Sequence, residues 1–184
     1  MSESGFTLFE TTIGTCGIAW GPHGIRTVRL PEASPRATRA RTLARCPDAR
    51  EAVPPPAVQR AIDGIVALLR GEAADLREVG LDLDGVAPFD RAVYAVARAI
   101  PPGATLTYGE VAARLTEPGT ARDVGQSLGN NPFPIVVPCH RVLAAGGKLR
   151  GFSAPGGVAT KLRLLTIEGA HSDTPTLFDG VATV

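Results

Sequence analysis

Residues 107–142 read TYGEVAARLTEPGTARDVGQSLGNNPFPIVVPCHRV, and this stretch decides the fold of the C-terminal half of the chain. Thr107 and Thr120 are each followed three residues later by an acidic residue, which is the spacing of a capping box. The first box predicts a helix over 108–115, and the second predicts a helix that the sequence GNNP at 129–132 ends. Two short helices joined by a turn are typical of a helix-turn-helix, although such pairs are also common as plain structure.

The end of this stretch carries the nucleophilic residues. Prolines on both sides of residues 135–137 exclude a helix and predict a short buried extended run that leads to Cys139. A free cysteine has a pKa of about 8.5, so it needs a base to react near neutrality. His140 can accept the proton directly or through water, and Arg141 adds positive charge. Taken alone, the pair also fits a buried cysteine beside a surface histidine.

The preceding residues alternate between strand and helix patterns. Glycine and proline clusters separate three short apolar runs, which predict an antiparallel meander followed by a Pro/Ala-rich connector. The strands are expected at 6–10, 14–20, 25–30 and 81–87, and helices at 35–46, 57–70 and 88–100. The fold class is therefore α+β. A small sheet domain spans 1–87, a mainly helical domain spans 88–170, and 171–184 form a flexible tail without periodicity.

Composition limits the classes of protein that fit. The 184 residues are 44% hydrophobic, enough for a core, and the net charge is only +1, which excludes a polyanion binder that is basic throughout. Residues 1–104 are balanced in charge, whereas 105–170 carry 7 basic and 4 acidic residues. There is no leader-like start and no apolar run of about 18 residues. We expect a soluble, cytoplasmic protein that does not engage a membrane.

The three cysteines are widely spaced and form no CxxC pair, which argues against a disulfide framework. A zinc site that uses Cys16, His23 and Cys46 is conceivable. The simpler interpretation places Cys16 in a strand and Cys46 at a helix end or in the connector.

The sequence PCHR at 138–141, preceded by NPFPIVV, resembles the active-site signature of the O6-alkylguanine-DNA alkyltransferases, also called methylated-DNA–protein-cysteine methyltransferases. Further similar motifs follow the family order from about 88 to 169. These motifs are TYGEVA at 107–112, ARDVG at 121–125, GFSAPGG at 151–157 and KLRLLTIE at 161–168. The resemblance implies a ribonuclease H-like N-terminal domain and a helix-turn-helix C-terminal domain.

The resemblance also implies the chemistry. Cys139 would accept the alkyl group of O6-methylguanine, and of O4-methylthymine, in an irreversible single turnover that repairs DNA by direct reversal. His140 would take the thiol proton through a water molecule, and Glu168 would orient His140. Asn131 would hold the turn before the active-site run, and Tyr108 would donate a hydrogen bond to the guanine. No metal or organic cofactor is expected, because the thiol itself is the acceptor.

The implied partner is double-stranded DNA, approached by a monomer from the minor groove with the alkylguanine flipped out of the stack. Arg122 would fill the gap that the base leaves, and the Val142 carbonyl and Ser153 would read the base edge. The DNA-contacting residues implied in this way are Tyr108, Thr120, Ala121, Arg122, Gly125, Gln126 and Arg141. The small positive excess predicts few phosphate contacts and a shallow salt dependence.

Two other functions compete with this one. A damage-sensing DNA-binding protein without chemistry is the first, and the presence of Cys139 argues against it. A thiol hydrolase that uses Cys139 and His140 is the second. It would need an oxyanion site and a deacylating water, and the sequence indicates neither.

Overall fold

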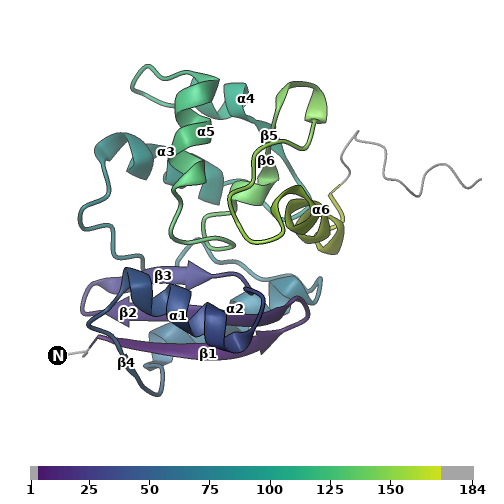
Figure 1. Ribbon diagram of the computed structural model, residues 1–184. Coiled ribbons are helices and arrows are strands. Elements are labelled where there is room, and N and C mark those ends of the chain that lie inside the picture. The colour runs from purple at the N-terminus through teal and green to yellow at the C-terminus, as the bar shows by residue number, and fades with distance from the viewer. Residues whose placement is uncertain (1–3, 171–184) are drawn as a thin grey trace, which may run out of the picture.

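The N-terminal half of the computed structural model, which describes residues 4–170, is a four-stranded sheet with helices on its faces (Figure 1). The strands are β1 (Gly5–Thr11), β2 (Gly14–Gly21), β3 (Gly24–Arg29) and β4 (Arg50–Glu51). Their order is β3-β2-β1-β4, with β1, β2 and β3 antiparallel and β4 parallel to β1. Gly14 and Gly24 have φ angles of +123° and +133°, which a side chain would disfavour at these hairpin corners.

Helices α1 (Pro35–Arg45) and α2 (Pro56–Leu69) cover the sheet. α1 begins at Ser34, whose hydroxyl accepts a hydrogen bond from the Ala37 amide at 3.2 Å. Successive residues of β2 face opposite sides, so Ala19 joins a small cluster under α1 while Ile18 joins the main core with α2. Apolar burial on both faces therefore holds the sheet between the two helices.

The C-terminal half is mainly helical, and its first helices were predicted closely. Its elements are α3 (Pro88–Arg98), β5 (Leu106–Thr107), α4 (Tyr108–Ala113), α5 (Ala121–Gly129), the 3₁₀ turns η1 (Cys139–Arg141) and η2 (Ala145–Gly147), β6 (Val142–Leu143) and α6 (Gly157–Ile167). Both capping boxes are present: the hydroxyls of Thr107 and Thr120 each accept a hydrogen bond at 3.2 Å, from the amides of Glu110 and Asp123. α4 ends two residues before the predicted position, and β5 and β6 pair in parallel.

The expectation of a strand over residues 81–87 is wrong. Only Leu81 forms a bridge, to Ile25, and the next residues turn because the Asp82 carboxylate accepts the Asp84 amide at 3.0 Å. The fourth strand is the two-residue β4 instead. The expected extended run at 135–137 is buried, but it turns rather than pairing in a sheet: Ile135 has a φ of +73°, and the Val137 amide donates to the Phe133 carbonyl at 2.7 Å. The predicted tail at 171–184 lies outside the described residues.

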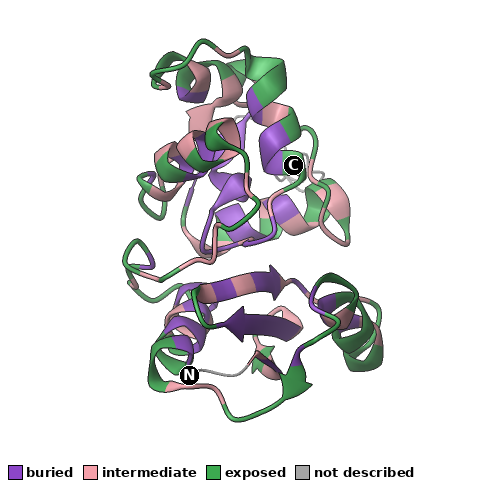
Figure 2. Cartoon of the chain, turned by 90° about the vertical axis from the view of Figure 1, so that its left-hand side faces the viewer, coloured by how far each residue is buried: buried purple, intermediate pink, exposed green. Residues whose placement is uncertain are grey.

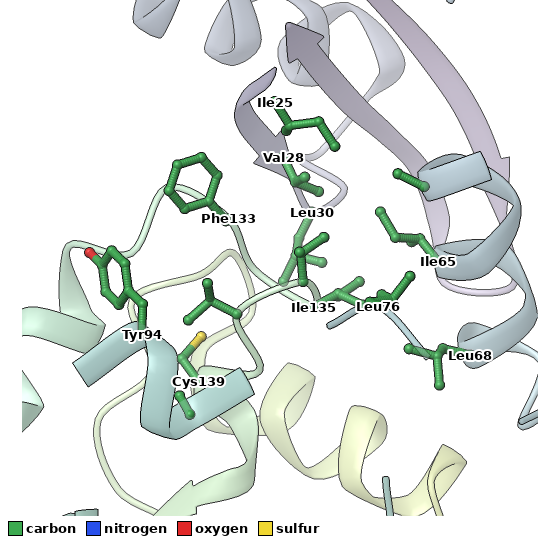
Figure 3. Packing of buried hydrophobic residues seen from close by; sticks show 14 of the residues in the cluster. Ile25, Val28, Leu30, Ile65, Leu68, Leu76, Tyr94, Phe133, Ile135 and Cys139 are labelled. Carbon is green, nitrogen blue, oxygen red and sulfur yellow. The ribbon is translucent and has the colours of Figure 1, made fainter. Parts of the chain in front are cut away.

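One hydrophobic core joins the two halves. Figure 3 shows Phe133 and Ile135 next to Val28 and Leu30, with Cys139 in the same cluster. In Figure 2 the buried residues lie on the strands and on the inward sides of the helices. The Pro132 carbonyl accepts hydrogen bonds at 2.9 Å from the Val28 amide and from the Thr27 hydroxyl. Strand β3 therefore fixes the loop that leads to the cysteine. Among residues 4–170, no helix is both long and apolar enough to cross a membrane.

Candidate active site

Cys139 lies at the start of η1, at the end of the loop that β3 anchors. Cys139 is 9% exposed, and its thiol forms no disulfide bond. Cys139 lines a groove of about 830 Å³ between α1 and the C-terminal end of α5. Burial raises the pKa of the Cys139 thiol, and a hydrogen bond from Asn131 and the charge of Lys161 lower it. A base is therefore needed to form the thiolate.

The Asn131 side chain bridges the backbone of the loop that precedes the cysteine. Its Nδ2 donates to the Val137 carbonyl at 2.9 Å, and its Oδ1 accepts the Phe133 amide at 2.9 Å. One side chain thus replaces the strand pairing that residues 133–137 lack. These two bonds hold the turn before the active-site run, which is the role that the family resemblance implies for Asn131.

His140 and Glu168 form a buried pair. The distance between His140 Nε2 and Glu168 Oε1 is 2.9 Å, and the two side chains are 1% and 5% exposed. Arg141 donates to the same carboxylate from Nε at 2.9 Å and from Nη2 at 2.8 Å, and its Nη1 donates to the Ile100 carbonyl at 2.6 Å. The carboxylate therefore accepts three hydrogen bonds from cationic or ring nitrogens.

These contacts decide which ring nitrogen of His140 can act as a base. Burial raises the pKa of Glu168, but the hydrogen bonds from His140 and Arg141 outweigh it and bring the value to about 2. Burial lowers the pKa of His140, with Glu168 opposing that shift, so the ring is neutral near pH 7. An ionised carboxylate only accepts, so we assign the imidazole proton to Nε2. Nδ1 is then a free acceptor, buried and without a partner among residues 4–170.

Lys161 is a site residue that the sequence interpretation missed. It is fully buried, and its Nζ donates to the Val142 carbonyl at 2.6 Å. The ammonium lies 5.5 Å and 6.0 Å from the ring centroids of Tyr108 and Phe152. Burial lowers its pKa to about 8. The available signal was its helical spacing with Leu164 and Leu165, which are also buried.

Two of the residues predicted for the base pocket, Tyr108 and Val142, contact Lys161. The Tyr108 hydroxyl is 3.3 Å from the Gly151 carbonyl, and burial raises the pKa of this tyrosine. The Val142 carbonyl already accepts the Lys161 ammonium, which holds the carbonyl in place and leaves its second lone pair. The Ser153 hydroxyl donates to the Gly129 carbonyl at 2.8 Å and so ties the 152–155 loop to the end of α5.

The predicted DNA-contacting residues of α5 lie mostly on its surface. Thr120, Ala121, Arg122 and Gln126 are exposed, and Gly125 is half-buried against the Tyr108 ring. Arg122 has no hydrogen bond or ion pair within residues 4–170, so its guanidinium is free to bind a partner. A Cβ at Gly125 would lie 3.9 Å from the tyrosine ring, which is ordinary contact.

One expectation needs correction, and the zinc site that was weighed as an alternative is also decided by the geometry. Arg141 is only 5% exposed and uses its guanidinium on Glu168 and Ile100, so it does not contact DNA as expected. A zinc site from Cys16, His23 and Cys46 is not assembled, because both cysteines are buried apart from the exposed His23. In the described part of the chain, the group close enough for a shared ion is His23 with Asp82 and Asp84.

The chain is similar in sequence to known proteins. Residues 88–170 match the family model described as "6-O-methylguanine DNA methyltransferase, DNA binding domain". The methylated-DNA–protein-cysteine methyltransferase of Methanothermobacter thermautotrophicus is 37% identical over 153 residues, which are 83% of this chain and 78% of that protein. The namesake from Mycolicibacterium paratuberculosis is 44% identical over 126 residues, 68% of this chain and 74% of that protein.

Solved structures are similar as well. The O6-methylguanine methyltransferase of Mycobacterium tuberculosis superposes with a TM-score of 0.71 at 33% identity, over 91% of this chain and 93% of that chain. A structure of the Mycobacterium tuberculosis protein in complex with DNA has a TM-score of 0.69 at 33% identity, over 89% and 92% of the two chains. The likeness therefore covers the sheet half as well as the helical half.

Proposed function

Because the chain belongs to the methylated-DNA–protein-cysteine methyltransferase family, we propose that it repairs DNA by moving the alkyl group of O6-methylguanine onto its own Cys139. The observation that carries the assignment of this residue is its position between an open groove and the buried His140–Glu168 pair. The same transfer from O4-methylthymine belongs to the proposal, because the bond that breaks is of the same kind. DNA is the partner, as it is in the complex of the mycobacterial relative.

The reaction uses three residues in sequence. Glu168 keeps the His140 proton on Nε2, so Nδ1 takes the thiol proton of Cys139 through a water molecule. The thiolate attacks the alkyl carbon, the carbon–sulfur bond forms as the bond to O6 breaks, and the electron pair leaves with the guanine. The proton then returns to the guanine, so atoms and charges balance. A thioether is stable, so each molecule reacts once.

Lys161 positions the Val142 carbonyl, which accepts a hydrogen bond from the guanine in the proposed complex. Its bond to Val142 fixes the carbonyl that accepts from the guanine edge, and its positive charge favours the Cys139 thiolate. The Tyr108 hydroxyl donates to the Arg150 and Gly151 carbonyls at 3.5 Å and 3.3 Å in the free protein, and it turns its hydrogen to the guanine ring when the base is bound. Ser153 fixes the loop that closes the pocket.

We propose that α4 and α5 act as a helix-turn-helix on the minor groove of duplex DNA. The alkylated carbon is inside the base stack, so the nucleotide must flip out, which costs a few kcal/mol. The exposed Arg122 fills the vacated space, and the small exposed residues of α5 allow close approach to the groove. We propose a monomer as the binding form.

We also propose that the sheet half is ribonuclease H-like. Three antiparallel strands are followed by a helix, and the next strand pairs in parallel with β1 to give the order β3-β2-β1-β4. This arrangement supports the topology implied by the family resemblance.

Arg122→Ala is expected to slow repair of duplex DNA by at least about tenfold, because an uncompensated gap in the stack raises the cost of flipping. Single-turnover rates on an O6-methylguanine duplex measure the effect. The reaction with free O6-benzylguanine, which needs no flipping, should keep its rate. An Arg122→Ala protein that repairs duplex DNA as fast as wild type would disprove the role of this arginine.

The function itself is tested by weighing the intact protein after incubation with a duplex that contains O6-methylguanine. One adduct of about 14 Da per molecule, mapped to Cys139 by peptide analysis, is expected because one hydrogen is replaced by one methyl group. DNA binding without any adduct would instead indicate a damage sensor.

A further inference from the structure

The groove that opens at Cys139 has a wall from each half of the protein. The C-terminal wall consists of the end of α5, residues 129–134 and the 152–155 loop. The other wall is α1 and the end of β3, and in Figure 1 α1 lies in front of the sheet. The predicted DNA contacts all lie in the C-terminal half, so they leave this second wall without a role.

Small and basic residues make up the α1 wall. Ala37, Ala40 and Ala44 line the groove together with Arg41 and Arg45. Their spacing of three or four residues places them on one face of the helix. The small alanine side chains leave room for a ligand to come close to the helix backbone. The longer arginine side chains beside them extend from the helix surface towards such a ligand. Arg29 adds a third guanidinium from the end of β3.

These three arginines carry positive charge that the protein does not neutralise. None of them has an ion pair or a side-chain hydrogen bond within residues 4–170, and the Arg29 Nε is buried with no partner. Burial lowers the pKa of Arg29, and the charges of Arg45 and Arg41 lower it further. Glu32 is the one acidic residue in the described lining of the groove.

Two other arginines of the N-terminal half, by contrast, form ion pairs. Arg26 bonds Asp48 at 2.7 Å, and Arg39 bonds Glu51 at 3.4 Å. Arg29, Arg41 and Arg45 thus lie together and unpaired at the groove, although residues 1–104 as a whole carry no net charge. A net charge summed over the sequence does not reveal this local positive charge.

We propose that Arg29, Arg41 and Arg45 bind the phosphodiester backbone of the damaged strand beside the nucleotide that is delivered to Cys139. The proposal rests on the proposed function, because a strand that presents a base to this thiol brings its backbone to the mouth of the groove. Guanidinium groups bind phosphate oxygens in bidentate geometry, which suits arginines in this position. The N-terminal half is thus part of the DNA interface.

The test compares the salt dependence of DNA binding in matched variants. The first variant is Arg41→Gln with Arg45→Gln, both exposed, and the second adds Arg29→Gln. The control is Arg60→Gln with Arg70→Gln, two exposed arginines on and just after α2 that also have no partner in the described chain. Each protein carries Cys139→Ala, so that binding to an O6-methylguanine duplex is measured without reaction.

The slope of log affinity against log salt should become shallower by about 0.9 for each phosphate that an arginine no longer neutralises, so by about 2 in the first variant and nearly 3 in the second. The control should keep the wild-type slope. In proteins that retain Cys139, the reaction with free O6-benzylguanine should keep its rate, because that substrate has no phosphate.

Unchanged slopes in both cluster variants would overturn the proposal. So would a cluster variant with an unchanged slope that reacts more slowly only with an O6-carboxymethyl base, since the arginines would then bind an anionic adduct. Failure of the proposed function is distinct, because wild type itself would then form no adduct at Cys139.

Discussion

Cys139→Ala is expected to abolish alkyl transfer completely and to leave the affinity for duplex DNA unchanged within experimental error. In the proposed reaction the Cys139 sulfur bonds the alkyl carbon, and no other described cysteine lines the groove. Removing one sulfur atom leaves the α5 surface and the groove arginines as they are. Intact-mass analysis measures the transfer, and a gel-shift or anisotropy titration measures the affinity.

Cys46→Ala is the matched control for this variant. Cys46 is the buried C-cap residue of α1 and does not line the groove, and burial raises the pKa of its thiol as it does for Cys139. The Cys46→Ala protein should still form one adduct. An adduct that persists in the Cys139→Ala protein would show that another residue is the acceptor.

Glu168→Gln is expected to cause the second large effect, on both the rate and the free energy of unfolding. The variant leaves the buried Arg141 without a counter-ion, and removing one member of such a pair costs about 3–5 kcal/mol. It also removes the anion that fixes the His140 tautomer, so the rate should fall on the order of 100-fold. Urea denaturation and single-turnover kinetics measure the two effects. Glu72→Gln, at an exposed position, is the control and should change neither.

The acid stability of the wild-type protein tests the same pair without a substitution. The pKa of Glu168 falls from its ordinary 4.5 to about 2 in the folded protein. A depressed carboxyl pKa stabilises the fold above the unfolded value, and the stabilisation is lost as pH falls from about 4.5 towards 2. The full loss is about 3 kcal/mol. The difference between wild type and Glu168→Gln should shrink over this pH range, and a constant difference would contradict the ion pair.

Local signals made the helical elements predictable. The hydroxyls of Thr107 and Thr120 act on amides three residues away, so each capping box could be recognised in the sequence alone. The apolar periodicity of 57–70 was also sufficient, and α2 was predicted within a residue at each end. Where strands are only two residues long, as in β4, β5 and β6, no periodicity exists to detect. Residues 81–87 show the converse error, since their alternation belongs to a turn.

The sequence by itself determined the capped helices α4 and α5, because capping depends on residue type and near neighbours, and the PCHR motif made Cys139 and His140 the candidate reactive pair through its resemblance to the family signature. Only the tertiary structure shows the contacts of Arg141 and Lys161 and the common position of the groove arginines. Arg141 reaches a carboxylate 27 residues away and is therefore buried rather than bound to DNA. The charges of residues 1–104 sum to zero, yet the packing of α1 beside the end of α5 places Arg41 and Arg45 in the lining of the same groove as Cys139. The interaction between charges depends on their separation in space, and a sum of charges along the sequence does not contain that separation.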